Sequence, residues 1–155
     1  MARFGALRFT ALLLALAGCG QADLPGHYWD LSASTQVDGC NSPAVQYSED
    51  FEYRLVIDVT DIEVAIGPDT FAVGTIDGCT VSYDSIVWTE PRDAGDIQWT
   101  LSGTATAQRG NGACGISTDW IGTETFTVLS SDDPTVSPGC EYVLDLVGSY
   151  AGEVQ

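Results

Sequence analysis

The feature that most constrains this chain is a repeated alternation of apolar and polar residues. Asp61–Ile66 reads Asp-Ile-Glu-Val-Ala-Ile, and Asp96–Ala107 sets Ile97, Trp99 and Leu101 on one face of an extended segment. A period of two is typical of β-strands that bury one face, and no window keeps a helical period over three turns. The pattern predicts eight strands, at His27–Ser34, Phe51–Asp58, Asp61–Ile66, Thr70–Ile76, Cys79–Glu90, Asp96–Ala107, Gly122–Leu129 and Cys140–Tyr150.

The links between the central strands are short. They are Val59-Thr60, Gly67-Pro68-Asp69, Asp77-Gly78 and Pro91–Gly95. Short links force consecutive strands to run antiparallel as neighbours, so this part of the chain is a meander. We therefore expect an all-β fold, an eight-stranded up-and-down barrel that leaves no exposed sheet edges. A two-sheet β-sandwich is the alternative. Within Cys79–Glu90 we expect one face to carry Val81, Tyr83, Ser85 and Val87.

The first 18 residues have the organisation of an export signal. Arg3 and Arg8 give a positive start, and the uncharged apolar run Phe9–Leu16 is too short to span a bilayer stably. The segment ends in Leu16-Ala17-Gly18-Cys19, which resembles the lipobox of bacterial lipoproteins. That resemblance implies cleavage before Cys19, a diacylglycerol thioether on its sulfur, and acylation (palmitate) of the new amino terminus.

The lipobox resemblance divides the chain into a cleaved signal peptide at residues 1–18, a lipidated tether at 19–26 and one β-barrel domain at 27–155. Two or three acyl chains hold a protein on a membrane stably, whereas one holds it marginally. Gly20 replaces the Asp that retains similar lipoproteins of enteric bacteria in the inner membrane. We therefore expect a lipid-anchored protein of the bacterial cell envelope, at the outer membrane. The competing interpretations are a plain secretory signal with an incidental Cys19 and a buried helix.

Four cysteines remain when Cys19 is set aside. They are Cys40, Cys79, Cys114 and Cys140, an even number in a chain exported to an oxidising compartment, which favours two disulfides. A zinc site is the rival, but the spacings contain no Cys-x-x-Cys pair. In the meander, Cys40 and Cys140 fall at one end of the barrel and Cys79 and Cys114 at the other. The strand directions therefore predict the pairs Cys40–Cys140 and Cys79–Cys114.

The charge of the mature chain is strongly negative. Removing the signal leaves three arginines, no lysine and all 22 acidic residues, a net charge of −19. Such a surface repels phosphate backbones and anionic lipid headgroups, which argues against nucleic-acid binding. The acidic residues are separated by apolar ones, the pattern of a solvated sheet face. Examples are Asp58, Asp61, Glu63, Asp69, Asp77 and Asp84.

An eight-stranded barrel in an exported protein, with a tryptophan near its start, is similar to the lipocalins. That likeness implies a small apolar ligand inside the barrel, in a pocket to which Trp29, Trp88, Trp99 and Trp120 could contribute. Two departures are visible in the sequence. The opening Gly26-His27-Tyr28-Trp29 has one residue more than the lipocalin Gly-x-Trp, and Cys140–Tyr150 contains no basic residue.

Residues for catalysis are sparse. His27 is the only histidine, and no Gly-x-Ser-x-Gly elbow occurs, so we expect no enzyme, no cofactor and no resident metal. Two alternatives are considered. Asp58, Asp61 and Glu63 could act as catalytic carboxylates, and Asp132-Asp133 or Asp93/Asp96 could bind calcium. The sequence favours a membrane-anchored, non-catalytic structural or interaction module whose partner it does not name. The alternative is a lipocalin-like binder of a small apolar molecule.

Overall fold

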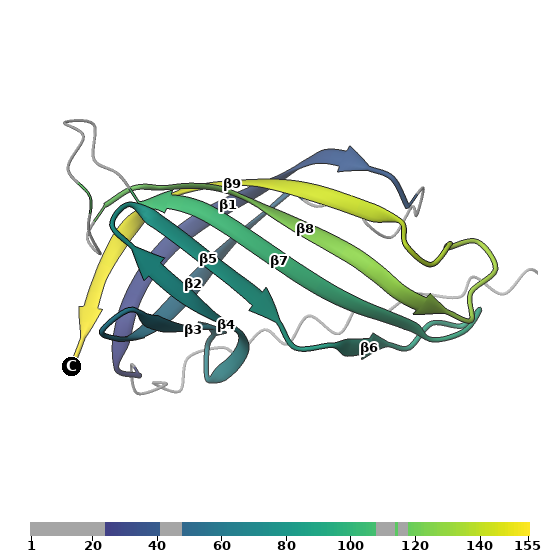
Figure 1. The fold of residues 1–155 in the computed structure, drawn as a ribbon, viewed down its shortest axis with the longest axis horizontal. Coiled ribbons are helices and arrows are strands. Elements are labelled where there is room, and N and C mark those ends of the chain that lie inside the picture. The colour runs from purple at the N-terminus through teal and green to yellow at the C-terminus, as the bar shows by residue number, and fades with distance from the viewer. Residues whose placement is uncertain (1–23, 41–47, 108–113, 115–117) are drawn as a thin grey trace, which may run out of the picture.

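The computed structural model describes residues 24–40, 48–107, 114 and 118–155, and within them it is built from antiparallel strands alone (Figure 1). The strands are β1 (Gly26–Asp38), β2 (Ser48–Asp58), β3 (Asp61–Ile66), β4 (Asp69–Asp77), β5 (Thr80–Ser85), β6 (Trp88–Glu90), β7 (Ile97–Ala107), β8 (Trp120–Ser131) and β9 (Glu141–Val154). Across these ranges no helix is long and apolar enough to cross a membrane. The lipobox, including Cys19, lies outside the described residues.

The sheet closes on itself. Its order is β5-β4-β3-β2-β1-β9-β8-β7-β6, and an additional pairing joins β5 to β7. Eight strands thus form the predicted up-and-down barrel, while β6 is an extra strand that pairs with β7 beyond the end of β5. Closure also brings the first and last strands together, because β1 pairs with β9 along most of its length. The sandwich alternative is not the observed fold.

The prediction of one continuous strand over Cys79–Glu90 is wrong. Asp84 lies opposite Ser102 on β7, but the next recorded pair is Trp88 with Trp99, so three residues on one side face two on the other. This one-residue insertion has the effect of a β-bulge and ends the alternation. Val87 is consequently 55% exposed rather than on the inner face. Ser85 helps to fix the break, since its Oγ accepts a hydrogen bond from the Leu101 N–H at 2.7 Å.

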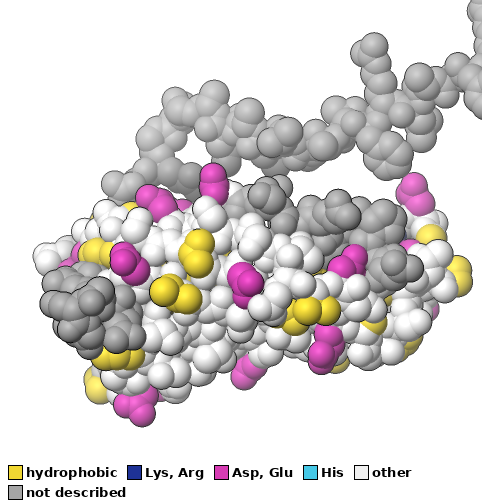
Figure 2. Space-filling model, turned by 90° about the horizontal axis from the view of Figure 1, so that it is seen from above, with side chains coloured by type: hydrophobic (Ala, Val, Ile, Leu, Met, Phe, Trp, Pro, Cys, Tyr) yellow, Lys and Arg dark blue, Asp and Glu magenta, His cyan; other side chains and the backbone are white. Residues whose placement is uncertain are grey.

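Side chains on the inner faces of the strands form one continuous core. Its most buried large members are Trp29, Trp120, Leu31, Leu55, Ile97, Leu146, Val64, Val81 and Val128. Outside, the carboxylates expected on a solvated face are exposed as predicted: Asp58, Asp61, Glu63, Asp69, Asp77 and Asp84. Figure 2 shows one side of the barrel, on which acidic side chains are scattered among apolar ones.

Two disulfides cross-link the barrel, and they join the cysteines that the strand directions predict. We call the end that holds the start of β1 and the carboxyl terminus the terminal end, and the opposite end, which holds β6, the loop end (Figure 1). Cys40–Cys140 closes the loop end and Cys79–Cys114 the terminal end, with Cα atoms 5.0 and 4.7 Å apart. The first ties the end of β1 to the start of β9.

Candidate interior site

A single carboxylate lies in the interior of the barrel. Glu124 on β8 is 1% exposed, and two phenols donate hydrogen bonds to the same oxygen, Oε1. The hydroxyl of Tyr53 on β2 and that of Tyr83 on β5 each lie 2.6 Å from this oxygen. Both tyrosine rings are themselves buried. We refer to Tyr53, Tyr83 and Glu124 as the interior triad.

The strand register explains how these side chains meet. Gly103 on β7 lies opposite Tyr83 on one side and opposite Glu124 on the other. Because Gly103 has no side chain, the ring of Tyr83 lies directly over it and reaches the carboxylate; a Cβ atom here would overlap that ring. Tyr53 comes from β2, which is not a neighbour of β7 or β8 in the sheet. The triad therefore depends on barrel closure.

Burial dominates the electrostatics of the triad. It raises the pKa of Glu124, and the hydrogen bonds from Tyr53 and Tyr83 lower that pKa by less than burial raises it. Burial and the neighbouring carboxylate raise the pKa of both tyrosines above their ordinary value. The two arginines of the described chain are used elsewhere, Arg54 on backbone carbonyls and Arg92 on Glu90.

Two indoles lie beside the triad. The Trp120 ring centroid is 6.4 Å from that of Tyr53 and 6.3 Å from that of Tyr83, and Trp29 packs edge-on against Trp120 at 5.6 Å. The Trp29 Nε1–H donates to the Thr118 carbonyl at 2.9 Å. By contrast, the buried Trp120 Nε1–H has no acceptor within the described parts of the chain. An unsatisfied buried donor is uncommon in folded proteins.

The chemistry that this arrangement supports is proton exchange at Glu124. All three groups lie in a low-dielectric interior, where neutral phenols can stabilise a carboxylate but cannot cancel its charge. Among the described residues, the Tyr53 and Tyr83 hydroxyls both donate to Glu124, and this arrangement differs from the nucleophile–base–orienting-group relay of hydrolases. His27 bonds instead to the Tyr150 hydroxyl, at 3.1 Å.

The four tryptophans of the predicted pocket fall into two pairs. Trp29 and Trp120 pack together beside the triad. Trp88 and Trp99 face each other across β6 and β7 at the loop end, where Trp88 packs on Phe126 and Trp99 on Tyr142. Trp29, Trp99 and Trp120 are fully buried, and Trp88 is half-buried. Trp29, Trp99 and Trp120 belong to the hydrophobic core, and Trp88 packs against it.

The acidic residues considered above for catalysis and calcium binding lie on the outer wall or in loops. Asp58 and Asp61 face each other across the β2–β3 turn, on the exposed wall that also carries Glu63. In the loop after β8, the hydroxyl and backbone N–H of Thr135 donate to Asp133 and lower its pKa. Among the residues that the structure places, no group of three His, Cys, Asp or Glu side chains is arranged to hold a metal ion.

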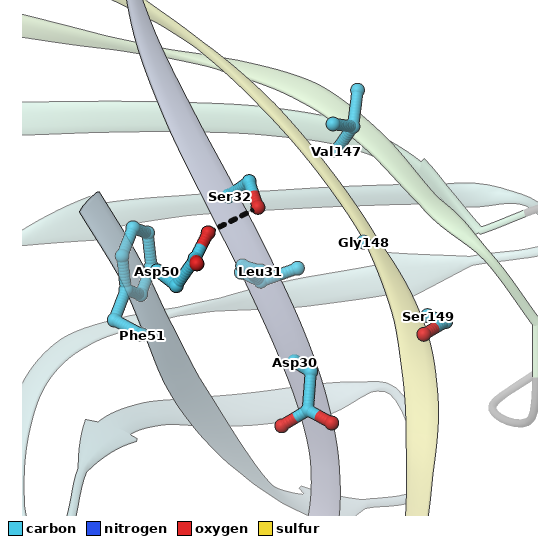
Figure 3. Close-up of a pocket in the computed structure, with 8 residues that line it drawn as sticks. All are labelled: Asp30, Leu31, Ser32, Asp50, Phe51, Val147, Gly148 and Ser149. Atoms are coloured by element: carbon cyan, nitrogen blue, oxygen red, sulfur yellow. Dashed lines mark hydrogen bonds between the residues drawn. The ribbon is translucent and has the colours of Figure 1, made fainter. Parts of the chain in front are cut away.

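Two shallow hollows lie on the outer wall. The larger, of about 590 Å³, crosses β2, β1 and β9, and we call it the β1 groove (Figure 3). Its lining residues are Asp30, Leu31, Ser32, Asp50, Phe51, Val147, Gly148 and Ser149. The Ser32 hydroxyl donates to Asp50 Oδ1 at 2.5 Å across its floor. The smaller, of about 480 Å³, crosses β2, β3 and β4 and includes Asp58, Asp61 and Glu63.

Glu124 is the residue that sequence reasoning missed. It is one of the 22 acidic residues, yet the run from Trp120 to Val128 places Trp120, Glu124 and Val128 on the same face of a strand. A carboxylate in phase with two large apolar residues is the signal that could have identified it.

Comparison with known proteins finds no related protein: the chain matches no protein-family model, no curated sequence and no solved structure.

Proposed function

We propose that this chain is a lipid-anchored, non-catalytic module of a bacterial cell envelope, and that it acts by binding another macromolecule with its outer surface. The observation that carries the proposal is the content of the barrel. Its interior is occupied by its own aromatic and aliphatic side chains, and the interior carboxylate already receives two hydrogen bonds from tyrosines. This content favours the outer wall and the loops as the surface that binds another molecule.

Two further features support an envelope location. Both disulfides suit an oxidising compartment outside the cytoplasm, as the lipobox requires. The lipobox cysteine, Cys19, precedes the first described residue, Leu24, by only five positions. At about 3.5 Å per residue, the intervening chain spans at most about 18 Å, which would hold the barrel close to the membrane.

The anchoring is tested by expressing the full chain with Cys19→Ala and separating membrane from soluble fractions. We expect the unaltered chain in the membrane fraction, with a mass increase from lipid on residue 19, and the variant in the soluble fraction. Gln21→Ala, two residues beyond the cysteine, is the matched control and should remain lipidated. An unaltered chain without lipid, or a Cys19→Ala chain still in the membrane, would refute the anchor.

The second candidate function is the binding of small apolar molecules, and the observation that favours it lies at the loop end. There Phe51, Trp88 and Phe126 are only half-buried although they belong to the inner face. Titrating the protein with a series of apolar fluorescence quenchers tests this function, because four tryptophans report on the interior. Saturable quenching at one site would favour the ligand binder over the interaction module, and linear collisional quenching would favour the module.

A further inference from the structure

Among the strands that the structure describes, the wall of the barrel is incomplete at the loop end. Strand β2 pairs with β1 over Ser48–Leu55, but with β3 only from Arg54 to Asp58. Within the described residues, Ser48–Tyr53 therefore has a partner strand on one side only, and we call this segment the open edge. Across the gap from the open edge, β6 has β7 as its one partner among the described strands. Figure 1 shows β6 continuing the line of β5 toward the loop end.

The cause of the open edge is the short β3–β4 hairpin. Strand β3 has six residues whereas β1, β2 and β7 have eleven or more, so the hairpin turns back at Gly67 before it reaches the loop end. Unpaired strand edges are usually blocked by charges, bulges or covering loops, since they accept further strands. Six residues of strand offer about 20 Å of edge, enough for a short added strand.

The two faces of the open edge differ in chemistry. Phe51 points to the inner side, where its ring packs against that of Tyr53 at 4.9 Å. Asp50 and Glu52 point to the solvent and are exposed. A strand paired here would place alternate side chains beside Phe51 and the others beside these carboxylates. The matching sequence alternates apolar and basic residues.

The β1 groove continues this outer face. It begins at Asp50 and Phe51 on β2 and extends over Ser32 on β1 to Val147 on β9 (Figure 3). An outward-pointing basic side chain of an added strand can lie across β2 and bring its charge to the carboxylate of Asp50, on the side of the groove nearest the open edge. The groove and the open edge thus recognise the same kind of partner.

A second copy of this chain does not fit this description. It would bring 22 carboxylates and, once the signal at residues 1–18 is removed, three arginines toward an edge that is itself acidic. Of the arginines that the structure describes, Arg92 is bound to Glu90, and Arg54 is 8% exposed and bound to the Pro25 and Gly67 carbonyls. Like charges on both sides oppose self-association.

We propose that the open edge of β2 binds an extended segment of a basic partner protein, which adds a strand to the barrel wall and places basic side chains beside Asp50 and Glu52. Strand addition of this kind takes affinity from main-chain hydrogen bonds and specificity from alternate side chains. The inference deepens the proposed function, because it names the surface and the chemistry of the partner. It does not depend on the lipid anchor.

The experiment uses the detergent-solubilised full chain and two synthetic probes of equal composition. One is an octapeptide that alternates valine and arginine, and the other places its valines and arginines in separate blocks. We expect the alternating peptide to bind more tightly and to slow amide hydrogen exchange in Ser48–Tyr53. Asp50→Lys combined with Glu52→Lys should weaken binding by on the order of tenfold, as expected for two lost charge pairs.

Glu63→Lys is the matched control, since Glu63 is an exposed carboxylate on the outer wall of β3, beyond the open edge. It should bind the alternating peptide as the unaltered chain does. Equal affinity for the two peptides, or protection away from Ser48–Tyr53, would overturn the proposal. So would protection of this segment before peptide is added, since another part of the chain would then cover it, or protection that appears only on dimerisation. Each measurement is independent of whether Cys19 carries lipid, so failure here and failure of the anchor are separable.

Discussion

Two carboxylates of the barrel are held in opposite ways. Glu124 lies in the closed interior, 1% exposed, and accepts hydrogen bonds from two neutral phenols. Glu90 at the loop end has a side chain that is 40% exposed, and it accepts hydrogen bonds from both Nε and an Nη atom of Arg92 at 2.9 and 3.0 Å. The Trp99 indole adds a third at 2.9 Å.

The difference lies in how each charge is compensated. A guanidinium and nearby water offset the charge of Glu90, so this network fastens β6 to β7 at little cost and contributes little. Glu124 has donors but no opposite charge in a low-dielectric interior, where each lost partner leaves a larger penalty. Substitutions in the interior triad should therefore lower the free energy of unfolding substantially, whereas a substitution of Glu90 should lower it only slightly.

The largest effect should come from removing both phenol donors. Tyr53→Phe combined with Tyr83→Phe leaves the Glu124 carboxylate buried without the two donors that now satisfy Oε1. We expect the free energy of unfolding to fall by about 2–4 kcal/mol, the cost of losing two buried hydrogen bonds to a carboxyl group. Urea unfolding at neutral pH measures this loss.

Tyr28→Phe provides the control for that pair, because Tyr28 is half-buried and donates a hydrogen bond to the Leu24 carbonyl at 2.6 Å. Losing this neutral hydrogen bond should cost about 1 kcal/mol. If the double variant lost no more stability than Tyr28→Phe, the two hydrogen bonds to Glu124 would contribute no more than an ordinary neutral one.

Gly103→Ala should have the next largest effect. The added Cβ would occupy the space of the Tyr83 ring, which must move away from Glu124. We expect a loss of about 1–3 kcal/mol from overpacking, with a changed near-ultraviolet dichroism spectrum as the aromatic packing shifts. Ser102→Ala, on the exposed face of the same strand, should change stability by about 0.5 kcal/mol or less. Equal effects at both positions would contradict the placement of Tyr83 over Gly103.

Most of the fold could be predicted because it follows from local patterns. Alternation located the strands, and short links required antiparallel neighbours, which fixed strand direction and hence both disulfide pairs. The break in Cys79–Glu90 could not be predicted this way. It depends on the register of β5 and β6 against β7, and on the contact between Ser85 and the Leu101 N–H. Both arise only after the strands pair.

The interior triad could be predicted only in part. Alternation places Tyr53 and Tyr83 on inner faces, and the phase of β8 places Glu124 there too. Their meeting requires strands β2, β5 and β8 to come together across a closed barrel, and a glycine on β7 over which Tyr83 can lie. The open edge of β2 likewise follows from unequal strand lengths, which sequence patterns define only approximately.

Glu124→Gln should change how stability depends on pH. Burial raises the pKa of Glu124 above its ordinary value of 4.5, so the folded chain holds this proton more tightly than the unfolded chain does. The contribution of neutral Glu124 is fully present below about pH 4.5 and is lost as the pH rises through the folded pKa, by at most about 1.4 kcal/mol per pH unit. The glutamine variant lacks this loss. Urea unfolding at a series of pH values measures this. As the pH rises, the free energy of unfolding of the variant should increase relative to that of the unaltered chain. A difference that stays constant with pH would contradict the raised pKa of Glu124.

Glu90→Gln should have the smallest effect. Its partner Arg92 has a side chain that is 15% exposed, and Glu90 itself is 40% exposed, so solvent already screens much of their attraction. We expect a loss of about 0.5–1 kcal/mol at low salt that shrinks at about 1 M NaCl, where the Debye length falls to about 3 Å. The effect of Tyr53→Phe combined with Tyr83→Phe should persist at the same salt concentration, because the interior excludes mobile ions. Measuring both variants in the two salts therefore separates a screened carboxylate from a buried one. A loss at Glu90 as large as that at the interior triad, or one that salt leaves unchanged, would show that both carboxylates are shielded from solvent.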